Sequence, residues 1–220
     1  MITIDGPSGT GKGTIAGLLA KSLGFELLDS GAIYRVVAVA AKREGIGAQE
    51  SSRLAALAKR VNISFCSGAP DGLRVLLDGD NVTEELRAEE TASMASRVAV
   101  IPEVREALLE TQRGFCQPPG LVADGRDMGT VIFPRATVKL YLTADPEERA
   151  KRRYKQLREK GISVSLPALV RDISDRDRRD STRAVAPLRP ADDAVVIDTT
   201  DLPIAAVLER TLSIVKQVLT

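Results

Sequence analysis

Histidine and tryptophan are absent from the 220 residues of this chain, and aromatic residues make up only 3% of it. The lack of histidine excludes Ser-His and Cys-His nucleophile pairs, and it excludes zinc sites with histidine ligands. The scarcity of aromatic side chains argues against a single-stranded nucleic-acid binder, because such proteins stack bases on aromatic rings. Any chemistry on this chain must therefore use carboxylates, lysine and arginine.

Cysteine is also scarce, with Cys66 and Cys116 as its two instances. They form neither a Cys-x-x-Cys pair nor a dense framework, so we expect free thiols in a reducing compartment. The chain has no run of 18 apolar residues, and its first residues, "MITIDGPSG", lack the charged and apolar regions of a signal peptide. The sequence therefore predicts a cytoplasmic protein with no membrane partner.

The net charge is only +1, but it is unevenly distributed. Residues 149–183 contain 12 Lys/Arg and 5 Asp/Glu, so this segment alone carries +7. The balanced total argues against a chain built chiefly to bind nucleic acid. We expect the basic segment to meet a smaller anion.

Short apolar runs alternate with helical patterns along most of the chain, which is typical of a mostly parallel sheet covered by helices on both faces. Strands are predicted over residues 1–5, 25–29, 120–124, 137–142 and 194–198. Helices are predicted from Lys12 to a stop at Gly24, over 32–44, over 102–113, from a cap at Asp145, and over 203–218. The pattern predicts an α/β fold with three layers (αβα) and a five-stranded parallel sheet.

One region interrupts this alternation. Residues 63–86 contain short β-rich runs separated by "GAPDG" and "DGDN", turn compositions that favour antiparallel hairpins. We expect a small antiparallel insertion over about 60–98, between the second and third core strands. The single domain would then combine this insertion with a basic helical segment over about 149–183 and a core of 1–59, 99–148 and 184–220.

The stretch "GPSGTGKG", Gly6 to Gly13, follows a predicted strand and opens a predicted helix, which is the context of a phosphate-binding loop. Its glycines let the backbone approach a ligand, so that successive N–H groups converge on phosphate oxygens at a helix N-terminus. Lys12 would add a positive charge beside the β- and γ-phosphates. The predicted ATP-binding residues are Gly6, Pro7, Ser8, Gly9, Thr10, Gly11, Lys12, Gly13 and Thr14.

The loop departs from the strict pattern at one position. Gly13 stands where Ser or Thr would follow the lysine, and Thr14 comes one residue later. The hydroxyl that normally contacts Mg²⁺ is displaced, so we expect Mg²⁺ to be coordinated through water and nucleotide oxygens, with Asp124 orienting one such water. Neither Asn62 nor Asn81 lies in an Asn-Lys-x-Asp motif, which argues against a GTPase.

If the loop holds ATP, the γ-phosphate needs an acceptor, and polar side chains at the ends of two predicted strands suit an anionic one. "DSGAIYR", residues 29–35, offers Ser30 as an expected N-cap and Arg35 about one turn into the next helix. "ADGRDMGT", residues 123–130, offers Arg126 and Asp127, and strand-end residues of open sheets face the ligand crevice. Taken alone, the first segment also fits an ordinary cap followed by a surface arginine.

A third segment, "DRDRRDSTR", residues 175–183, lies in the middle of the basic stretch. Helical spacing places four of its side chains on one face: Arg176, Arg179, Asp180 and Arg183. Such arginines could close over a nucleotide, neutralise the transferred phosphoryl group and exclude water. The same spacing also fits a solvated helix with i,i+4 ion pairs such as Asp172 with Arg176.

Together, "GPSGTGKGT", "LLDSGAIYR", "ADGRDMGTVIFP" and "DRDRRDSTRAVAPL", with the β-rich insertion between the second and third, resemble the bacterial-type cytidylate kinases. The resemblance covers Ile2 to about Asp198. It implies a P-loop kinase of pyrimidine metabolism that moves the ATP γ-phosphate directly, in line, to CMP or dCMP with Mg²⁺. It also implies that residues 60–98 bind the monophosphate and that 149–183 form a lid. We expect ATP, CMP and dCMP as partners, and a monomer.

The resemblance assigns roles to individual residues. The acceptor phosphate would be held by Arg35, Arg126 and Arg183, the sugar by Arg176 and Asp180, and the base by Ser96, Arg105 and Asp127, with Asp29 and Ser30 completing the substrate-binding set. Cytosine offers an N4 amino donor and O2 and N3 acceptors, whereas uracil reverses the pattern at positions 3 and 4. The predicted catalytic residues are Lys12, Arg126, Asp127, Arg176 and Arg183.

Alternatives stay open. From local pattern alone, Ser96 and Arg105 fit structural roles in helices. A kinase for UMP, AMP or another small metabolite would use the same donor loop. A nucleotide-sensing or structural module would bind ATP without transferring phosphate, but the charge clustered in three acceptor segments argues against it.

Overall fold

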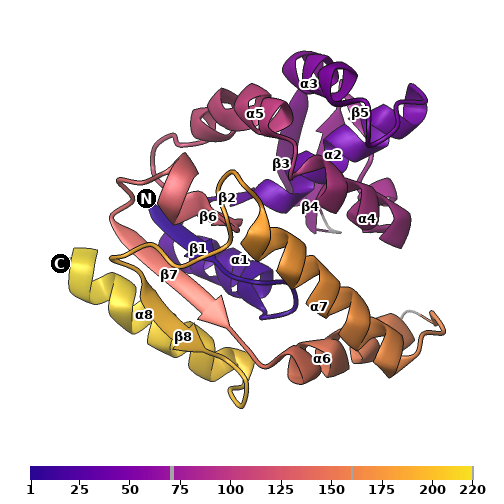
Figure 1. Ribbon diagram of the computed structural model, residues 1–220. Coiled ribbons are helices and arrows are strands. Elements are labelled where there is room, and N and C mark those ends of the chain that lie inside the picture. The colour runs from indigo at the N-terminus through magenta and orange to yellow at the C-terminus, as the bar shows by residue number, and fades with distance from the viewer. Residues whose placement is uncertain (70–71, 160, 220) are drawn as a thin grey trace. The chain divides into compact units, whose positions relative to one another are not determined.

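The computed structural model of the chain describes residues 1–69, 72–159 and 161–219. The chain forms two compact units, coloured along its length in Figure 1. Unit 1 comprises Met1–Leu28 and Phe115–Thr220, and unit 2 comprises Asp29–Gly114.

Unit 1 is built on a five-stranded sheet with the strand order β2-β6-β1-β7-β8. The strands are β1 (Ile2–Asp5), β2 (Glu26–Asp29), β6 (Leu121–Gly125), β7 (Val138–Thr143) and β8 (Val195–Asp198). β1 pairs in parallel with β6 and β7, and β7 pairs in parallel with β8. The predicted strands are confirmed, and each bound differs by at most one residue.

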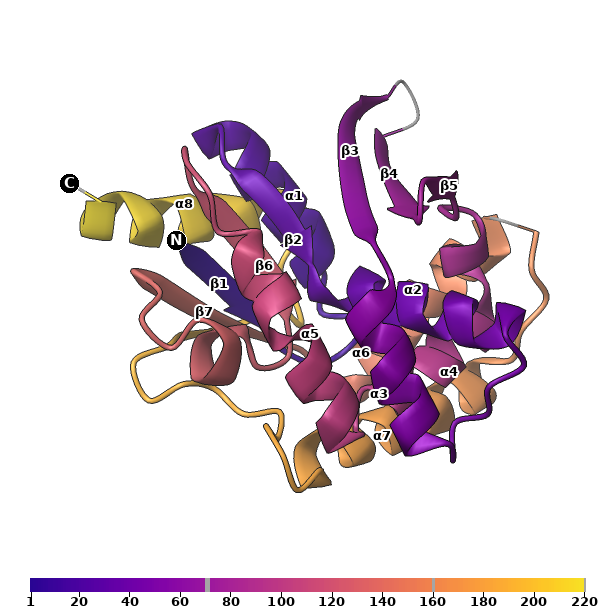
Figure 2. The ribbon, with the colours of Figure 1, turned by 90° about the horizontal axis from the view of Figure 1, so that it is seen from above.

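Two helices pack beside each other against this sheet (Figure 2): α1 (Lys12–Leu23) and α8 (Ile204–Leu219). α1 ends where predicted, because Gly24 adopts φ 65° and its N–H bonds back to the carbonyls of Ala20 and Lys21. The shared core contains, among others, Ile2, Ile4, Ile15, Leu19, Leu140, Val207 and Val215. Burial of these strand and helix faces fixes the sheet that carries the loops of the candidate site.

The basic segment of unit 1 folds as two helices, α6 (Pro146–Glu159) and α7 (Leu166–Thr182). They pack on each other through a small second core of Ala150, Leu157, Leu169 and Ile173. The predicted cap at Asp145 is confirmed, since its carboxylate accepts the N–H of Glu147 at 2.8 Å.

Unit 2 combines helices with a small antiparallel sheet. Its elements are α2 (Ser30–Arg43), α3 (Ser51–Arg60), β3 (Ile63–Ala69), β4 (Gly72–Leu77), β5 (Asp80–Asn81), η1 (Glu85–Arg87), α4 (Glu89–Val98) and α5 (Pro102–Gly114). β4 pairs antiparallel with β3 and β5, so the predicted hairpins are confirmed, although Pro70 and Asp71 of the first turn lie outside the described residues. The unit extends beyond the expected insertion because α2 packs on α4 and α3 packs on α5.

Cys116 is an exposed free thiol, and the Cys66 side chain lies outside the described ones. None of the described helices combines the length and the apolar character needed to cross a membrane.

Candidate functional site

The phosphate loop joins β1 to α1, and close approach of neighbouring backbone explains its glycines. Gly6 has φ 146°, and a Cβ there would come within 2.0 Å of the Leu142 carbonyl oxygen. A Cβ on Gly9, where φ is 83°, would meet the Cβ of Arg149 at 3.0 Å. Side chains are therefore excluded at both positions, and the loop backbone is left bare in front of the helix N-terminus.

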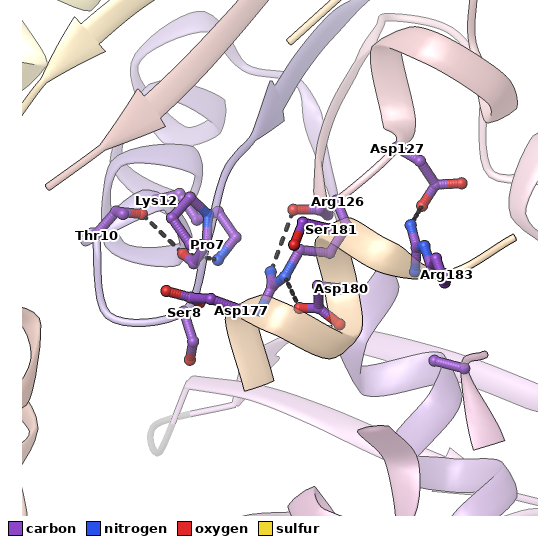
Figure 3. Close-up of polar contacts among 12 residues, drawn as sticks. Pro7, Ser8, Thr10, Lys12, Arg126, Asp127, Asp177, Asp180, Ser181 and Arg183 are labelled. Carbon is purple, nitrogen blue, oxygen red and sulfur yellow. Dashed lines mark hydrogen bonds and ion pairs between the residues drawn. The ribbon is translucent and has the colours of Figure 1, made fainter. Parts of the chain in front are cut away.

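Lys12, the first residue of α1, folds back over this loop (Figure 3). Its Nζ donates to the carbonyl of Pro7 at 3.0 Å, and the hydroxyl of Thr10 donates to the same carbonyl at 3.2 Å. Only 8% of Lys12 is exposed. An ammonium group is thus held against the loop where helix-end N–H groups already favour an anion.

Arg149 connects the loop to both helices of the basic segment. Its side chain is 3% exposed and donates from Nε to Ala144 O at 2.9 Å and from Nη1 to Ser8 O at 3.0 Å. Its Nη2 donates to Asp177 Oδ2 at 2.5 Å. One buried guanidinium therefore joins the start of α6, the phosphate loop and α7.

Asp124, near the end of β6, lies beside the start of α1. A Cβ on Gly13 would stand 3.1 Å from Asp124 Oδ2. The carboxylate thus fills the space that the missing Ser or Thr side chain of the strict motif would need. Among the described residues no cluster of three or more His, Cys, Asp or Glu could hold a metal.

Two ion pairs join the segment after β6 to α7 and the residue that follows it (Figure 3). Arg126 Nε donates to Asp180 Oδ2 at 2.9 Å, and Arg183 Nη2 donates to Asp127 Oδ1 at 3.2 Å. Burial alone would lower the pKa of Arg126, but the Asp180 carboxylate, together with those of Asp124 and Asp177, raises that pKa above its ordinary value. The predicted residues Arg126, Asp127, Asp180 and Arg183 are thereby brought together.

The other two arginines predicted on this helical face differ in exposure. Arg176 is half-buried on α7, one turn before Asp180, whereas Arg179 is exposed. Asp180 itself is buried with Arg126 as its partner. Of the four predicted side chains, Asp180 pairs with Arg126 from within α7, whereas Arg183 pairs with Asp127 from just beyond the helix, which ends at Thr182.

In unit 2, the start of α2 corrects one prediction. Asp29, and not Ser30, is the N-cap, because Asp29 has extended backbone angles and its Oδ1 accepts the N–H of Ala32 at 3.0 Å. The other oxygen of Asp29 accepts from Arg35 Nη2 at 2.7 Å. Ser30 is the first helical residue, and its hydroxyl donates to Gln112 Oε1 at 2.9 Å.

Arg105 and Ser96, the predicted base-reading residues of unit 2, are both buried. Arg105 Nη1 donates to Ala99 O at 3.2 Å and to the Tyr34 hydroxyl at 3.3 Å, so it connects α5 with α2. The Ser96 hydroxyl, on α4, has no hydrogen-bond partner among the described residues. A buried hydroxyl of this kind is uncommon in a folded protein and suits a position that meets a ligand.

Residues 2–217 match the family model described as cytidylate kinase. The chain belongs to the cytidylate kinase family. A cytidylate kinase from Pseudomonas fluorescens (strain SBW25) is 56% identical over 215 residues, which cover 97% of this chain and 93% of that protein. One from Vibrio cholerae serotype O1 is 54% identical over 216 residues, covering 98% and 96%. The resemblance inferred from the four motifs is therefore confirmed.

Structural comparison supports the fold of this cytidylate kinase family member. The crystal structure of an uncharacterized protein from Eubacterium ventriosum covers 98% of this chain and 97% of its own, with a TM-score of 0.51 at 11% identity. That likeness concerns the fold alone. The P-loop α/β prediction, with a five-stranded parallel sheet and a small antiparallel sheet, is confirmed.

Several residues that support the predicted ones in this kinase could not be recognised from the sequence. Arg149 is one of five basic residues in the first ten of α6, and nothing in "EERAKRRYK" distinguishes it. Gln112 accepts a hydrogen bond from Ser30, which lies 82 residues away in the sequence. Tyr34 accepts one from Arg105, which lies 71 residues away. Contacts over such separations leave no local pattern.

Proposed function

We propose that this protein transfers the γ-phosphate of ATP to CMP or dCMP, giving the corresponding diphosphate and ADP. The observation that carries the proposal is the bare loop Gly6–Gly13 with the Lys12 ammonium held over it at the start of α1. Membership of the cytidylate kinase family supports cytidine monophosphates as acceptors. The step needs no covalent intermediate, because positioning and charge neutralisation carry most phosphoryl transfers.

On the donor side, the loop N–H groups would hold the ATP phosphates, and Lys12 would reach the β- and γ-phosphates. Mg²⁺ would lie among nucleotide oxygens and water, with Asp124 holding one water. Bound there, the ion supplies positive charge that offsets the charge of the phosphates. The gap in the motif at Gly13 and the nearby Asp124 carboxylate support this arrangement.

On the acceptor side, three arginines would bind the monophosphate: Arg35, Arg126 and Arg183. Each is oriented by a carboxylate, and the partners are Asp29, Asp180 and Asp127 respectively. These pairs keep the guanidinium groups in place before the anion arrives, which lowers the entropic cost of binding. Arg176 and Asp180 would bind the sugar, and Asp29 and Ser30 would complete the substrate-binding set.

Cytosine would be read by Ser96, Arg105 and Asp127. Ser96 and Asp127 would accept the N4 amino group, and the Arg105 guanidinium would donate to O2 and N3. The unpartnered Ser96 hydroxyl supports this role. Uracil would leave buried polar groups unpaired, so we expect UMP to be a poor acceptor.

The two flexible parts expected of such a kinase would be the monophosphate-binding insertion at about 60–98 and the lid at about 149–183. Closure of the lid would exclude water that otherwise hydrolyses ATP. Arg149 supports coupling of the lid to the donor loop, because it contacts both. We further propose a cytoplasmic monomer that works in pyrimidine nucleotide metabolism and does not bind nucleic acid.

A coupled assay of ADP release tests the proposal, with Mg-ATP against CMP, dCMP, UMP, AMP, GMP and shikimate. Strong turnover confined to CMP and dCMP is the expected result. Turnover with UMP or AMP alone would point to another acceptor. ATP binding without turnover on any acceptor would overturn the kinase function and favour a binding module.

A further inference from the structure

Asp5, the last residue of β1, holds a buried carboxylate that none of the proposed donor or acceptor roles uses. It is 4% exposed. Its Oδ1 accepts the N–H of Met128 at 2.8 Å, and its Oδ2 accepts the N–H of Gly129 at 2.8 Å. Both oxygens are therefore committed to the backbone of a segment more than 120 residues away.

That segment is the short helical turn η2 (Met128–Ile132), which begins directly after Arg126 and Asp127. The first N–H groups of a helical turn have no partner within it and need an acceptor from elsewhere. Asp5 satisfies two of them at once. Its two hydrogen bonds thereby fix the backbone that follows the proposed phosphate-binding and base-reading side chains.

The fit between β1 and this turn is close. A Cβ on Gly129 would stand 2.9 Å from Thr3 Oγ1 and 3.4 Å from Asp5 Oδ2, so a side chain there would push the turn away from the strand. Asp5 also immediately precedes Gly6, the first residue of the phosphate loop. One residue therefore joins the donor loop covalently and the acceptor segment through hydrogen bonds.

The ionised carboxylate is costly at this position. The pKa of Asp5 is raised to about 7, chiefly by burial and to a smaller extent by the Asp127 and Asp124 carboxylates. The hydrogen bonds from Gly129 and Met128 act in the opposite direction and lower it. An apolar side chain would fill the space without that cost. The two amide hydrogen bonds are what the carboxylate contributes in return.

We propose that Asp5 is a positioning residue, which holds Arg126 and Asp127 in register with the phosphate loop through the amides of Met128 and Gly129. The inference rests on the proposed function, since Asp127 acts there as a reader of cytosine. Displacing a positioned group by about 1 Å can cost about 100-fold in rate. Loosening the turn should therefore affect the acceptor and its selection more than it affects ATP.

Asp5→Asn tests this proposal, since asparagine has nearly the same shape as aspartate. The substitution replaces one acceptor oxygen by an NH₂ group, which cannot accept the backbone N–H that it faces. We expect kcat/KM for CMP to fall at least about tenfold and the preference for CMP over UMP to fall at least about tenfold, with KM for ATP within about twofold of wild type. Thr3→Val is the matched control on the same strand, since the buried Thr3 hydroxyl has no hydrogen-bond partner among the described residues. It should leave all three quantities within about twofold.

A merely structural role would lower activity with CMP and UMP equally and leave the ratio unchanged, and that result would overturn the proposal. If Asp5→Asn does not fold, Gly129→Ala replaces it, because the added methyl displaces the same turn and should lower the same ratio. An unchanged ratio there would also count against Asp5. If the wild-type protein phosphorylates no CMP, the proposed function fails. Hydrogen exchange of the Met128 and Gly129 amides still tests the positioning role, and it should be slow in wild type and faster in Asp5→Asn.

Discussion

Arg149 and Asp177 form a short ion pair between α6 and α7, with 2.5 Å between Nη2 and Oδ2, while the same guanidinium donates to the Ser8 carbonyl of the phosphate loop. If α7 moves relative to the loop, Arg149 must therefore lose its contact with either Asp177 or Ser8. Arg149 thus links α6 and α7 to the phosphate loop through direct contacts.

Replacing Arg149 should weaken the contacts between α6, α7 and the phosphate loop. Arg149→Ala removes three hydrogen bonds and leaves the half-buried Asp177 without its partner, so we expect a loss of about 2–4 kcal/mol in the free energy of unfolding and a raised KM for ATP. Urea unfolding and steady-state kinetics measure the two effects. Lys151→Ala on the same helix removes only an exposed pair and should change both little. Equal effects of the two variants would contradict the role given to Arg149.

Lys12 should matter for turnover and much less for stability. Lys12→Ala removes the charge that would stabilise the transferred phosphoryl group, so we expect kcat to fall by about 100-fold or more. In the folded protein the Lys12 ammonium donates to Pro7 O, and a hydrogen bond from a charged group contributes about 1.5–3 kcal/mol, so the melting temperature should change by only several degrees. Lys21→Ala, at the exposed end of α1, is the control. Turnover near the wild-type rate in Lys12→Ala would remove the central claim for the loop.

The sheet and its helices could be predicted from sequence because their determinants are local. Runs such as "MITID" and "TVKLYL" are buried strands whose length and composition identify them, and Gly24 and Asp145 mark helix ends through their own backbone or side-chain chemistry. The four motifs that indicate the cytidylate kinase family are also local, because each is a short continuous stretch of sequence. The N-cap of α2 was misassigned because Asp29 and Ser30 are adjacent and both cap well, and only the backbone angles of Asp29 decide between them.

The supporting residues could not be predicted in this way. Asp5 reads as the end of an apolar strand, and its acceptor role depends on a turn more than 120 residues later. Gln112 reads as a polar position of a helix, yet it is fully buried because it meets Ser30. Tertiary packing decides these contacts, so a local pattern carries no signal for them.

Ser96→Ala should weaken the binding of CMP without lowering the stability of the folded protein. Its hydroxyl is buried without a hydrogen-bond partner among the described residues, so Ser96→Ala removes a group that contributes little to the folded protein. We expect an unchanged or slightly higher melting temperature, with KM for CMP raised about three- to thirtyfold. Ser93→Ala, exposed on the same helix, should leave KM unchanged. A destabilised Ser96→Ala with normal KM would assign the hydroxyl to packing instead.

Gly13 and Gly17 on α1 should respond in opposite ways to the same substitution. A Cβ on Gly13 would stand 3.1 Å from Asp124 Oδ2, whereas one on Gly17 would meet only Leu27 Cδ2 at 3.9 Å. Gly17→Ala should stabilise the protein by about 0.5–1 kcal/mol through helix propensity. Gly13→Ala should gain less or lose stability, and its activity should require more Mg²⁺ because the Asp124 carboxylate is displaced. A titration of activity with Mg²⁺ and thermal unfolding of both variants compare them, and similar Mg²⁺ requirements would count against the role of Asp124.

The buried Asp5 carboxyl should make stability depend on pH. Its pKa is raised from 3.8 in the unfolded chain to about 7 in the folded protein, chiefly by burial, so between these values the folded state binds more protons than the unfolded state. Its contribution is therefore fully present below about pH 4 and is lost as the pH rises through about 7, a change on the order of a few kcal/mol. Asp5→Asn does not titrate, so the difference in unfolding free energy between wild type and this variant should shift against wild type from pH 5 to pH 8. Urea unfolding of both proteins at each pH isolates that difference from all other titrating groups. A difference that stays constant over this range would mean that the folded protein ionises Asp5 as readily as the unfolded chain does.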